Sequence, residues 1–392
     1  MILGIAKEHY PDETRVALTP EVVPELVDIG LEPVVQEGAG QSSGFSNSSY
    51  EAAGATIVNT REEVYKKGDI VAQIHGFGSQ REDHLEELDL YEQGQVLVGL
   101  QNPRGRPRRL EKLADRGLTV FAMELIPRIS RAQNMDVLSS QATVSGYKSV
   151  LIAANEIPKM MPMMMTAAGT VTAARTLVIG AGVAGLQAIA TAKRLGSEVR
   201  AHDVRSNVKE EVESLGAKFV PVPAGDEQDS GVYAEERGEE FYERQRRLLL
   251  DIVPESDLVI TSAAVPGKKA PVLLTRKMVE GMDRGSVVVD LAAEQGGNCE
   301  LTESNEEMEM ANGVKIIGPT NLPSKLPVHA SNMYSNNINN FLKYLISDGK
   351  INLDMEDNII ENTLVVKEGK ILNDQLREAL NSEDDNDEGD EK

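Results

Sequence analysis

The stretch Thr176-Leu-Val-Ile-Gly180-Ala-Gly182-Val-Ala-Gly185 decides the fold of this chain. It carries the pattern G-x-G-x-x-G between an apolar, strand-like run and a helical pattern over residues 186–195. In that context the first glycine forms a tight turn, the second lets the backbone approach a pyrophosphate, and the third allows close packing of helix on strand. The pyrophosphate then lies at a helix N-terminus. The stretch therefore predicts a dinucleotide site that uses Gly180, Gly182 and Gly185.

An acidic residue follows at the distance that ribose recognition requires. Asp203 ends the next predicted strand, residues 198–203, and lies 18 residues after Gly185. A carboxylate there accepts hydrogen bonds from the ribose hydroxyls of NAD and repels the 2′-phosphate of NADP. Arg205, two residues further on, either neutralises such a phosphate or begins a surface helix. The pattern favours NAD over NADP and leaves the role of Arg205 open.

Strand-like and helical patterns alternate along most of the chain, which predicts parallel sheets with right-handed crossovers. The expected strands are 2–6, 32–36, 69–74, 95–100 and 118–123, followed by 175–179, 198–203, 217–222, 257–262, 286–291 and 314–318. We therefore expect an α/β protein with two Rossmann-like, doubly wound parallel-sheet domains joined by long helices. The second domain, residues 141–324, is predicted to be inserted in the first, which combines residues 1–140 with 325–380.

Helices and irregular segments complete this outline. Thr19-Pro20 predicts a helix that runs to Gly30 with Thr19 as N-cap, and longer helices are expected over 131–155 and 329–346. Residues 224–238 are acidic and long for a strand-to-helix connection, so we expect a mobile loop there. The last ten residues hold seven acids, which predicts a disordered acidic tail over 381–392. The methionines are expected to fill a core or a hinge: Met160, Met161 and Met163–Met165.

Composition excludes several classes of protein. The 392 residues carry 40 Lys and Arg against 63 Asp and Glu, a net charge of −23, which disfavours nucleic acid and anionic membranes as direct partners and suggests a halophilic source. The single cysteine, Cys299, excludes an internal disulfide, and the five histidines lack metal-ligand spacing, so no metal site is expected. The longest uncharged apolar run, 176–192, has 17 residues, whereas a membrane-spanning helix needs about 20. With charge near its start as well, the chain is expected to lack a signal peptide and to be cytoplasmic.

A polar cluster precedes the long predicted helix. Gln133, Asp136 and Ser140 are spaced by three and four residues, so a helix would place them on one face, with Arg128 and Ser139 near its ends. One interpretation is a solvated, capped helix face. The other is a ligand site, in which the Gln133 amide pairs with the amide of a nicotinamide and Asp136 binds a ribose.

Several segments resemble one known family. The N-terminal segment, Gly4-Ile-Ala-Lys-Glu-His-Tyr-Pro-Asp-Glu-Thr-Arg15-Val-Ala-Leu-Thr-Pro20, resembles the signature shared by alanine dehydrogenases and proton-translocating nicotinamide nucleotide transhydrogenases. The transhydrogenase version is matched by Arg128-Ile-Ser-Arg-Ala-Gln-Asn-Met-Asp-Val-Leu-Ser-Ser-Gln141, Pro162-Met-Met-Met-Thr-Ala-Ala-Gly169, Val265-Pro-Gly-Lys, Asp290-Leu-Ala-Ala-Glu-Gln-Gly-Gly-Asn298 and Thr320-Asn-Leu-Pro-Ser. Departures are Ala6 where proline is usual and Val232 where glycine is common.

The resemblance implies an NAD(H)-binding subunit of a transhydrogenase. Such a subunit is a homodimer and passes a hydride directly between NADH and NADP held on domain III of a partner. It lies on the cytoplasmic face of the cell membrane through a membrane-embedded subunit. Carried over by position, the residues implied around the nicotinamide are Arg128, Gln133, Asp136 and Ser139. Those implied for the rest of the dinucleotide are Gly180, Gly182, Val183, Ala184, Gly185, Asp203, Val204, Arg205, Val232, Tyr233 and Ala264, with Tyr233 on the loop that closes over the nucleotide.

Direct hydride transfer between two nicotinamides moves no proton to a side chain, so the site needs orienting groups and no general base. An alanine dehydrogenase, the first alternative, needs a lysine for the substrate carboxylate and a histidine as acid and base. The segments where that family places them read Ala72-Gln-Ile-His75-Gly and Val98-Gly-Leu-Gln-Asn102, without the lysine and with Gln or Asn for the histidine. Arg15 is common to both families. The second alternative is an NADH-sensing module without turnover.

Overall fold

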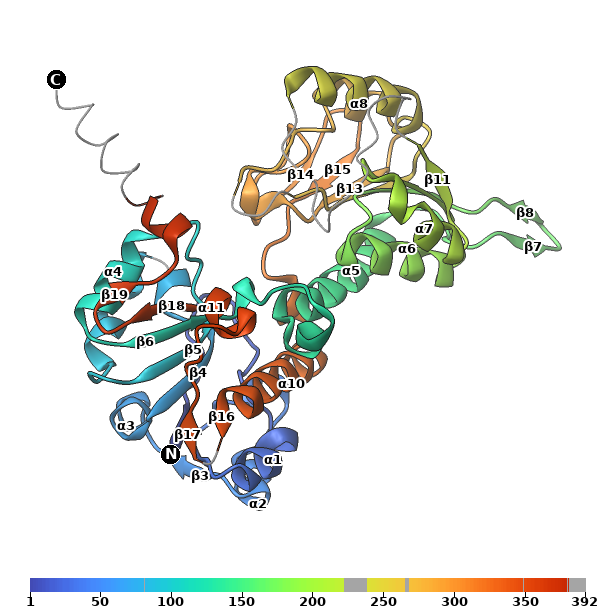
Figure 1. Cartoon of the computed structure of the whole chain (residues 1–392). Coiled ribbons are helices and arrows are strands. Elements are labelled where there is room, and N and C mark those ends of the chain that lie inside the picture. Colours follow the sequence, from blue (N-terminus) through green and yellow to red (C-terminus); the bar gives the residue numbers. More distant parts are fainter. Residues whose placement is uncertain (81, 222–237, 265–267, 348, 379, 381–392) are drawn as a thin grey trace. The chain divides into compact units, whose positions relative to one another are not determined.

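The computed structural model describes residues 1–80, 82–221, 238–264, 268–347, 349–378 and 380. The chain divides into two compact units (Figure 1). The first unit combines Met1–Gln141 with Pro323–Lys392, and the second is Ala142–Leu322. Each contains its own mainly parallel sheet with helices, so the predicted α/β class with two Rossmann-like sheets is confirmed. The acidic tail predicted over 381–392 lies outside the described residues.

The sheet of the first unit has the strand order β19-β18-β6-β5-β4-β1-β2-β3. Its parallel strands are β1 (Ile2–Ile5), β2 (Glu32–Gln36), β3 (Thr56–Val58), β4 (Ile70–His75), β5 (Val96–Leu100) and β6 (Thr119–Ala122). β18 (Leu364–Lys367) pairs antiparallel with β6, and β19 (Lys370–Ile371), at the edge, pairs antiparallel with β18; the sequence did not predict these two strands. After β3 the chain returns to the other side of β1, so the strand order reverses between β1 and β4. Ligands of such sheets bind at the carboxyl ends of the strands beside that reversal.

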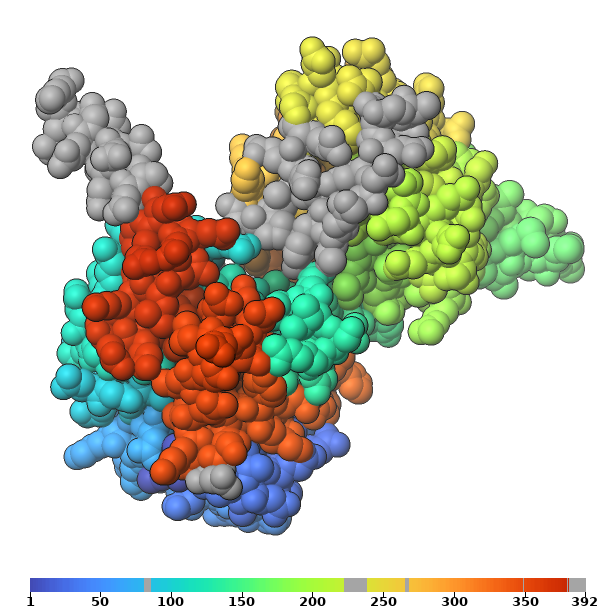
Figure 2. All heavy atoms as spheres, viewed as in Figure 1, coloured from blue at the N-terminus to red at the C-terminus, as the bar shows by residue number. Residues whose placement is uncertain are grey.

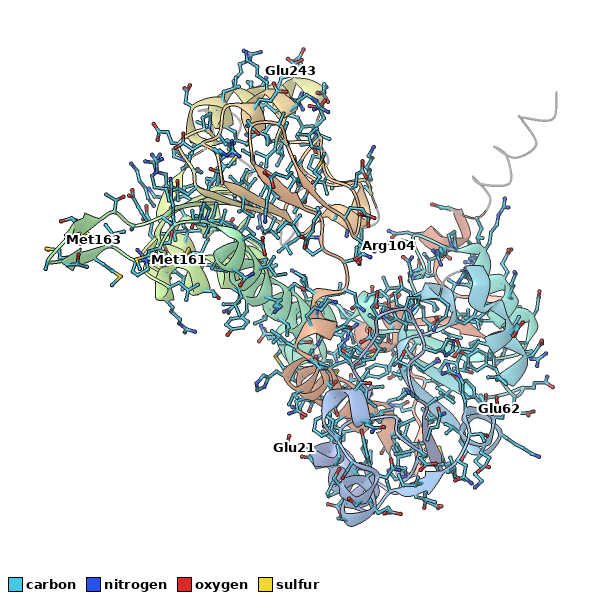
Figure 3. The ribbon with its side chains drawn as sticks, turned by 180° about the vertical axis from the view of Figure 1, so that it is seen from behind. Glu21, Glu62, Arg104, Met161, Met163 and Glu243 are labelled. Atoms are coloured by element: carbon cyan, nitrogen blue, oxygen red, sulfur yellow. The ribbon has the colours of Figure 1, made fainter. Side chains whose placement is uncertain are left out.

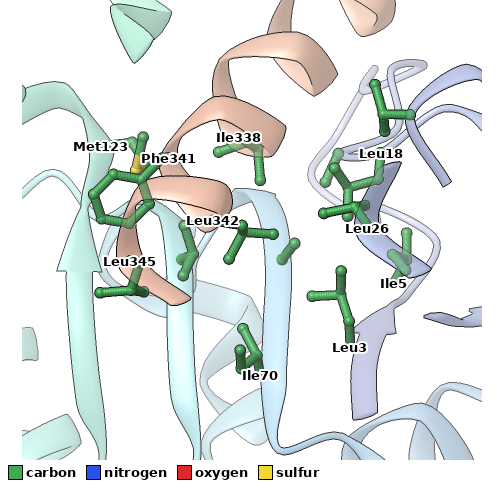
Figure 4. Close-up of a cluster of buried hydrophobic side chains, with 14 of the residues drawn as sticks. Leu3, Ile5, Leu18, Leu26, Ile70, Met123, Ile338, Phe341, Leu342 and Leu345 are labelled. Carbon is green, nitrogen blue, oxygen red and sulfur yellow. The ribbon is translucent and has the colours of Figure 1, made fainter. Parts of the chain in front are cut away.

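Both faces of this sheet are covered by helices. Leu3 and Ile5 of β1 and Ile70 of β4 point to the face that packs against α10 (Pro327–Leu345), as Figure 4 shows. Val71, between Ile70 and Ala72, belongs to the core on the opposite face, as the two-residue period of a strand requires. The other helices are α1 (Val23–Asp28), α2 (Asn47–Ala53), α3 (Arg61–Lys67), α4 (Arg108–Asp115) and α11 (Asn358–Thr363). A small hairpin pairs β16 (Ile346–Ser347) with β17 (Lys350–Ile351).

The sheet of the second unit has the order β11-β10-β9-β12-β13-β15-β14. Its parallel strands are β9 (Arg175–Ile179), β10 (Glu198–His202), β11 (Lys218–Val220), β12 (Leu258–Thr261), β13 (Val287–Asp290) and β15 (Lys315–Ile317), and β14 (Glu307–Glu309) runs antiparallel at the edge. Here the order reverses between β9 and β12. The helices are α6 (Val183–Arg194), α7 (Lys209–Ser214), α8 (Glu239–Ile252) and α9 (Arg276–Glu280), together with α5 (Val137–Glu156), which begins in the first unit.

A two-stranded hairpin of β7 (Met164–Thr166) and β8 (Gly169–Val171) projects from the second unit, and its atoms stand clear of the rest of that unit (Figures 2 and 3). The side chains of Met163 and Met165 are 62% and 80% exposed, and Met160 is exposed as well. Only Met161 of this group is buried. Of the expectation that these methionines fill a core or a hinge, the core is therefore wrong for most of them, because Met160 and Met163–Met165 are exposed.

Two predicted helices are divided in the structure. The helix expected from Thr19 to Gly30 is a 3-10 turn, η1 (Pro20–Val22), followed by α1, and Thr19 does not cap it with its side chain. Instead Thr19 Oγ1 donates to Ser335 Oγ of α10, 3.3 Å away. The helix expected over 131–155 is a 3-10 segment, η6 (Ser130–Met135), followed by α5. The remaining 3-10 turns are η2 (Gln41–Ser43), η3 (Phe77–Ser79), η4 (Glu82–Leu90), η5 (Met123–Leu125), η7 (Ser206–Val208), η8 (Ala293–Gln295) and η9 (Leu322–Lys325).

Hydropathy along the helices gives a negative result. In the residues that the structure describes, no helix combines the length and the apolar character needed to cross a membrane.

Candidate functional site

The glycine-rich turn lies at the carboxyl end of β9. Gly180 has a φ of +93°, in the left-handed region that glycine tolerates, and its N–H donates to the carbonyl of His202 at 2.8 Å. A Cβ on Gly180 would lie 2.9 Å from both the carbonyl carbon and the Oγ of Ser262. The turn is therefore possible only with glycine at this position.

The other two glycines of the motif have opposite surroundings. A Cβ on Gly185 would lie 1.8 Å from the carbonyl oxygen of Gly180, so this glycine lets α6 pack directly on the turn. A Cβ on Gly182, the N-cap of α6, would have no described heavy atom within 4 Å. The N–H groups of Val183 and Ala184 lie in the first turn of α6, where no intrahelical acceptor exists. Open space beside these donors fits the pyrophosphate of a dinucleotide.

Asp203 follows β10 and is buried beside this turn. Its Oδ2 accepts hydrogen bonds from the Ala181 N–H at 2.7 Å and from Arg205 Nη2 at 2.9 Å. Its Oδ1 accepts from the N–H and the Nε of Arg205 at 2.8 and 3.0 Å. Burial alone would raise the pKa of Asp203, but the hydrogen bonds and charge of Arg205 outweigh it and hold the pKa below the ordinary value. Arg205 thus pairs with Asp203, and Val204 lies between them.

A buried amide that sequence reasoning missed, Gln245, contacts the residue before Asp203. Gln245 on α8 is 1% exposed, and its Oε1 contacts Nε2 of His202, the residue before Asp203. The other ring nitrogen of His202 lies 3.0 Å from the Val220 carbonyl, so this histidine is a packing residue. Nε2 of Gln245 has no hydrogen-bond partner among the described residues. This amide is buried against the His202 ring, so we assign it to the packing of α8 on β10. Its spacing of four residues from buried Phe241 and Leu249 was the available signal.

The loop after β12 forms a further side of the turn. The Ser262 N–H donates to the Ile179 carbonyl at 2.8 Å, and Ser262 Oγ donates to the Gly180 carbonyl at 3.1 Å. Ala264, a predicted cofactor contact, follows two residues later and is exposed. Ala264 is therefore an exposed residue on the same loop as Ser262, which contacts the glycine turn. Val232 and Tyr233, the predicted contacts of the closing loop, lie outside the described residues.

The polar cluster of the first unit has a different geometry from the one predicted. Asp136 has φ −74° and ψ 92°, so it interrupts the helix between η6 and α5, and Gln133 does not share a helical face with Ser140. Asp136 accepts hydrogen bonds from the N–H and the Oγ of Ser139 at 2.9 and 2.7 Å. Arg128 Nε lies 3.9 Å from Asp136 Oδ2. The structure thus groups Arg128, Asp136 and Ser139, with Asp136 capping α5, and leaves the Gln133 side chain exposed.

Helix α10 holds this cluster in place. The Asn134 carbonyl accepts hydrogen bonds from Asn337 Nδ2 at 2.8 Å and from Asn340 Nδ2 at 3.2 Å. Arg131, on the same 3-10 segment, contacts Tyr344 Oη at 2.7 Å and Asp357 Oδ2 at 2.6 Å. These contacts from residues distant in sequence fix η6, so the exposed Gln133 is presented from a rigid backbone.

Comparison with known proteins adds the family. The model described as "Alanine dehydrogenase/PNT, N-terminal domain" matches residues 4–145, and the one described as "Alanine dehydrogenase/PNT, C-terminal domain" matches residues 149–374. The chain belongs to the alanine dehydrogenase/PNT family. The first part of "NAD(P) transhydrogenase subunit alpha" of Rhodospirillum rubrum is 45% identical over 95% of this chain and 98% of that protein.

Two further proteins differ in how similar their sequences are to that of this chain. The crystal structure of transhydrogenase from Sinorhizobium meliloti superposes with a TM-score of 0.83 at 42% identity, covering 95% of this chain and 100% of that one. "Alanine dehydrogenase" of Bacillus subtilis is 28% identical over 83% of this chain and 81% of that protein. The chain is therefore more similar to these transhydrogenases than to that dehydrogenase.

In this alanine dehydrogenase/PNT chain, a cluster of paired charged side chains lies in the first unit, near the carboxyl ends of β1 and β4, where the strand order reverses. The buried Arg15 donates to Glu13 through Nη2 at 2.6 Å and Nε at 2.8 Å, and to Gln141 Oε1 through Nη1 at 2.8 Å. His75 Nε2, at the end of β4, lies 3.0 Å from Glu13 Oε2. Burial would raise the pKa of Glu13, but Arg15 and His75 hold it well below the ordinary value. The charge of Arg15 is thus balanced by a carboxylate of the chain itself.

In the two units as far as they are described, no group of three or more His, Cys, Asp or Glu side chains is arranged to hold a metal ion. Cys299 is buried, which raises the pKa of its thiol to about 11.

Proposed function

We propose that this chain is the NAD(H)-binding subunit of a proton-translocating NAD(P) transhydrogenase. It holds NAD(H) while a hydride passes directly to or from NADP(H) bound on domain III of a partner. The observation that carries the proposal is the turn of the second unit. Gly180 and Gly185 bring the backbone together there, and Gly182 leaves open space at the start of α6. The similarity to the NAD(P) transhydrogenase alpha subunit of Rhodospirillum rubrum supports the same assignment.

The second unit supplies the residues that bind the dinucleotide in this proposal. The pyrophosphate takes the N–H groups of Val183 and Ala184 beside Gly182, and the adenosine ribose hydroxyls take the carboxylate of Asp203. A ribose hydroxyl that donates to Asp203 shares that carboxylate with Arg205, because both oxygens already accept hydrogen bonds from Arg205. We assign further contacts to Gly180, Gly185, Val204 and Ala264, and to Val232 and Tyr233.

The first unit supplies orientation rather than acid–base chemistry. Bound NADH supplies the hydride. Gln133 presents an exposed amide that can pair with the carboxamide of a nicotinamide. Asp136 holds Ser139 by two hydrogen bonds and lies near Arg128, so these side chains have fixed directions. Fixing the ring and excluding water are the contributions that direct hydride transfer requires of a protein.

We also propose that the chain acts as a homodimer bound to a membrane-embedded subunit on the cytoplasmic face of the cell membrane. The exposed hairpin of β7 and β8 supports the dimer. An isolated two-stranded hairpin is marginally stable in water, and Met163 and Met165 expose apolar side chains on it. Cross-linking of a Thr166→Cys variant tests this contact, because Thr166 is exposed and lies on the hairpin. Failure to cross-link in the complete complex would contradict a hairpin-mediated dimer.

A hydride-exchange assay tests the function itself. The chain is titrated with NADH, then mixed with an NADP analogue with and without the membrane subunit and the NADP(H)-binding domain. We expect tight NADH binding by the chain alone, exchange only with the partner present, and no NADH oxidation by pyruvate with ammonia. Oxidation by pyruvate would support the alanine dehydrogenase alternative. Binding without exchange in the full complex would support a sensing module.

A further inference from the structure

The segment Asp290-Leu-Ala-Ala-Glu-Gln-Gly296-Gly297-Asn298 has no role in the function proposed above. It begins with Asp290, whose carboxylate is fully buried. Asp290 lies at the carboxyl end of β13. Its Oδ1 accepts hydrogen bonds from Thr261 Oγ1 and the Ala292 N–H at 2.8 and 3.0 Å. Its Oδ2 accepts three more, from the N–H groups of Asn298 and Cys299 at 2.7 and 2.9 Å and from Thr302 Oγ1 at 2.7 Å. Five donors therefore converge on one side chain.

No ion pair joins Asp290 to a Lys, Arg or His among the described residues of the second unit. Burial of an unpaired carboxylate is costly unless hydrogen bonds replace its water. Hydrogen bonds to a charged acceptor are also stronger and shorter than neutral ones. The five donors to Asp290 are thus held firmly, and they come from the end of β12 and from the chain after β13.

Two glycines turn the chain back after β13. Gly296 and Gly297 have φ angles of +93° and +78°, which other residues rarely adopt. A Cβ on Gly297 would lie 2.9 Å from Cβ of Thr302 and 3.0 Å from Oδ2 of Asp290. This turn and the hydrogen bond from the Asn298 N–H to Asp290 fix the position of Asn298.

The fully buried Asn298 side chain forms hydrogen bonds with the backbone of residues that follow β12. Its Oδ1 accepts from the Ala263 N–H at 3.0 Å, and its Nδ2 donates to the Ala263 carbonyl at 2.7 Å and to the Pro271 carbonyl at 2.9 Å. Both backbone polar groups of Ala263 are therefore held by one amide. Ala263 follows Ser262, whose Oγ contacts Gly180 of the glycine turn.

We infer that Asn298, oriented by Asp290, is a positioning residue for the nicotinamide half of the bound dinucleotide. Asp203 follows β10, on one side of β9, and Ser262 follows β12, on the other side. A dinucleotide that crosses this reversal of strand order places adenosine on the β10 side and nicotinamide on the β12 side. Ala263, which Asn298 holds, thus lies on the nicotinamide side. This inference rests on the proposed function.

The chain offers a matched control for Asn298. Asn312 has the same hydrogen-bonding pattern within the second unit: its Nδ2 donates to two carbonyls, of Val279 and Glu280, at 3.1 and 3.2 Å, and its Oδ1 accepts from the Val314 N–H at 3.3 Å. It lies just before β15, away from the carboxyl ends of the strands. Asn298→Ala and Asn312→Ala therefore remove the same kind of bonds from two different ends of one unit.

The experiment measures the affinity of each variant for NADH and for AMP, and the rate of hydride exchange per bound complex in the reconstituted transhydrogenase. For Asn298→Ala we expect NADH affinity to fall about tenfold and the rate to fall by up to about a hundredfold, because a small displacement of the ring is sufficient. AMP affinity is expected to stay within about twofold. Asn312→Ala is expected to lower the melting temperature but to leave both affinities and the rate unchanged.

Thr302→Val provides a second variant in case Asn298→Ala does not fold. It removes one donor to Asp290 with little change of shape, and we expect NADH affinity to fall about threefold with AMP affinity unchanged. Equal losses for NADH and AMP, or wild-type NADH affinity and rate in both variants, would overturn the inference. Absence of NADH binding by the wild-type chain would instead overturn the proposed function.

Discussion

Both sheets reverse their strand order, but different groups occupy the carboxyl ends of the strands at the two reversals. In the first unit the reversal between β1 and β4 is filled by charged side chains of the chain itself, with Arg15 between Glu13 and Gln141 and His75 beside Glu13. In the second unit the reversal between β9 and β12 is lined by glycine backbone, and the space at Gly182 is open. A ligand needs both room and unsatisfied donors, so only the second edge is suited to a dinucleotide.

The difference teaches that topology locates a potential site and local sequence decides whether it is used. Both units place strand ends and helix starts at such an edge. The first fills it with an ion-pair cluster whose charges balance, which contributes to stability. The second keeps helix N–H groups free. Each of the following predictions changes one of these two properties.

Closing the open edge is expected to have the largest effect. In Gly182→Ala, the added methyl group meets no described atom, so the fold is expected to persist. The group nevertheless occupies the space in which we place the pyrophosphate, beside the α6 N–H groups. Loss of two charge-assisted hydrogen bonds lowers affinity by about a hundredfold or more. Fluorescence titration with NADH measures the change. An NADH affinity within about twofold of the wild type in Gly182→Ala would show that the pyrophosphate does not occupy the space beside Gly182.

A change in the first unit is expected to affect rate rather than affinity. Gln133→Ala removes an exposed amide from η6 without removing a packing contact. We expect most NADH affinity to remain while hydride exchange per bound complex slows by about a hundredfold, since displacement of a reacting ring by about 1 Å has such an effect. Titration and single-turnover exchange separate the two quantities. A collapse of affinity with an unchanged rate would make Gln133 a binding residue.

The sequence predicted the second unit better than the first, for physical reasons. The glycine motif, the strand before it and Asp203 are local in sequence, so turn chemistry alone identifies them. Gln133, Asp136 and Ser140 also have helical spacing, but Asp136 adopts an extended backbone and caps α5, so the spacing misled. That break depends on contacts of Asn134 with α10, some 200 residues away in sequence, which no local pattern contains.

Gln245 illustrates the other limit of the sequence. Its four-residue spacing from Phe241 and Leu249 marks a buried helix face, but spacing does not reveal that its amide contacts the ring of His202. The pairing of Arg205 with Asp203 also needed coordinates, because Arg205 was expected either to bind a 2′-phosphate or to lie on the surface.

Removing the buried acid of the open edge is expected to give a smaller loss than Gly182→Ala. Asp203→Ala deletes the carboxylate that we assign to the ribose hydroxyls and removes its ion pair with Arg205. One charged hydrogen bond contributes roughly 1.5–3 kcal/mol, so NADH affinity falls at least about tenfold and the preference over NADPH narrows. Titration of both nucleotides tests this. Unchanged affinities would show that Asp203 is only the partner of Arg205.

The filled edge has its own signature in pH dependence. Burial raises the pKa of Glu124, after β6, to about 7, and that of Glu8, after β1, to about 8. A carboxyl group whose pKa is higher in the folded state binds its proton more tightly there. Its contribution to stability is therefore complete below about pH 4.5 and is lost as pH rises to 7 or 8. Asp203 has a lowered pKa, so its contribution is lost only in acid.

Glu124→Gln tests that assignment because it makes the group permanently neutral. We expect the fall of unfolding free energy between pH 5 and 7 to become shallower, by up to about 1.4 kcal/mol per pH unit. Urea unfolding at several pH values measures the slope. Asp203→Asn, the matched change at the other edge, is expected to leave the slope in this range unaltered. A slope unchanged from that of the wild type would show that Glu124 does not titrate in this range, since Glu8 alone accounts only for the part that remains.

The smallest effect is expected from salt, which acts on the surface and not on either edge. At a net charge of −23 the chain repels itself, and salt shortens the range of that repulsion from about 30 Å at 0.01 M to about 3 Å at 1 M. Stability should therefore rise with KCl by several degrees in melting temperature. The ion pairs of Arg15 with Glu13 and of Arg205 with Asp203 are buried, so salt screens them weakly. Their weakening therefore subtracts little from the gain in stability. Melting in KCl, compared with melting in an uncharged osmolyte, isolates screening from general exclusion effects. A melting temperature that is flat in KCl would remove the case for a halophilic source and leave the comparison of the two edges intact.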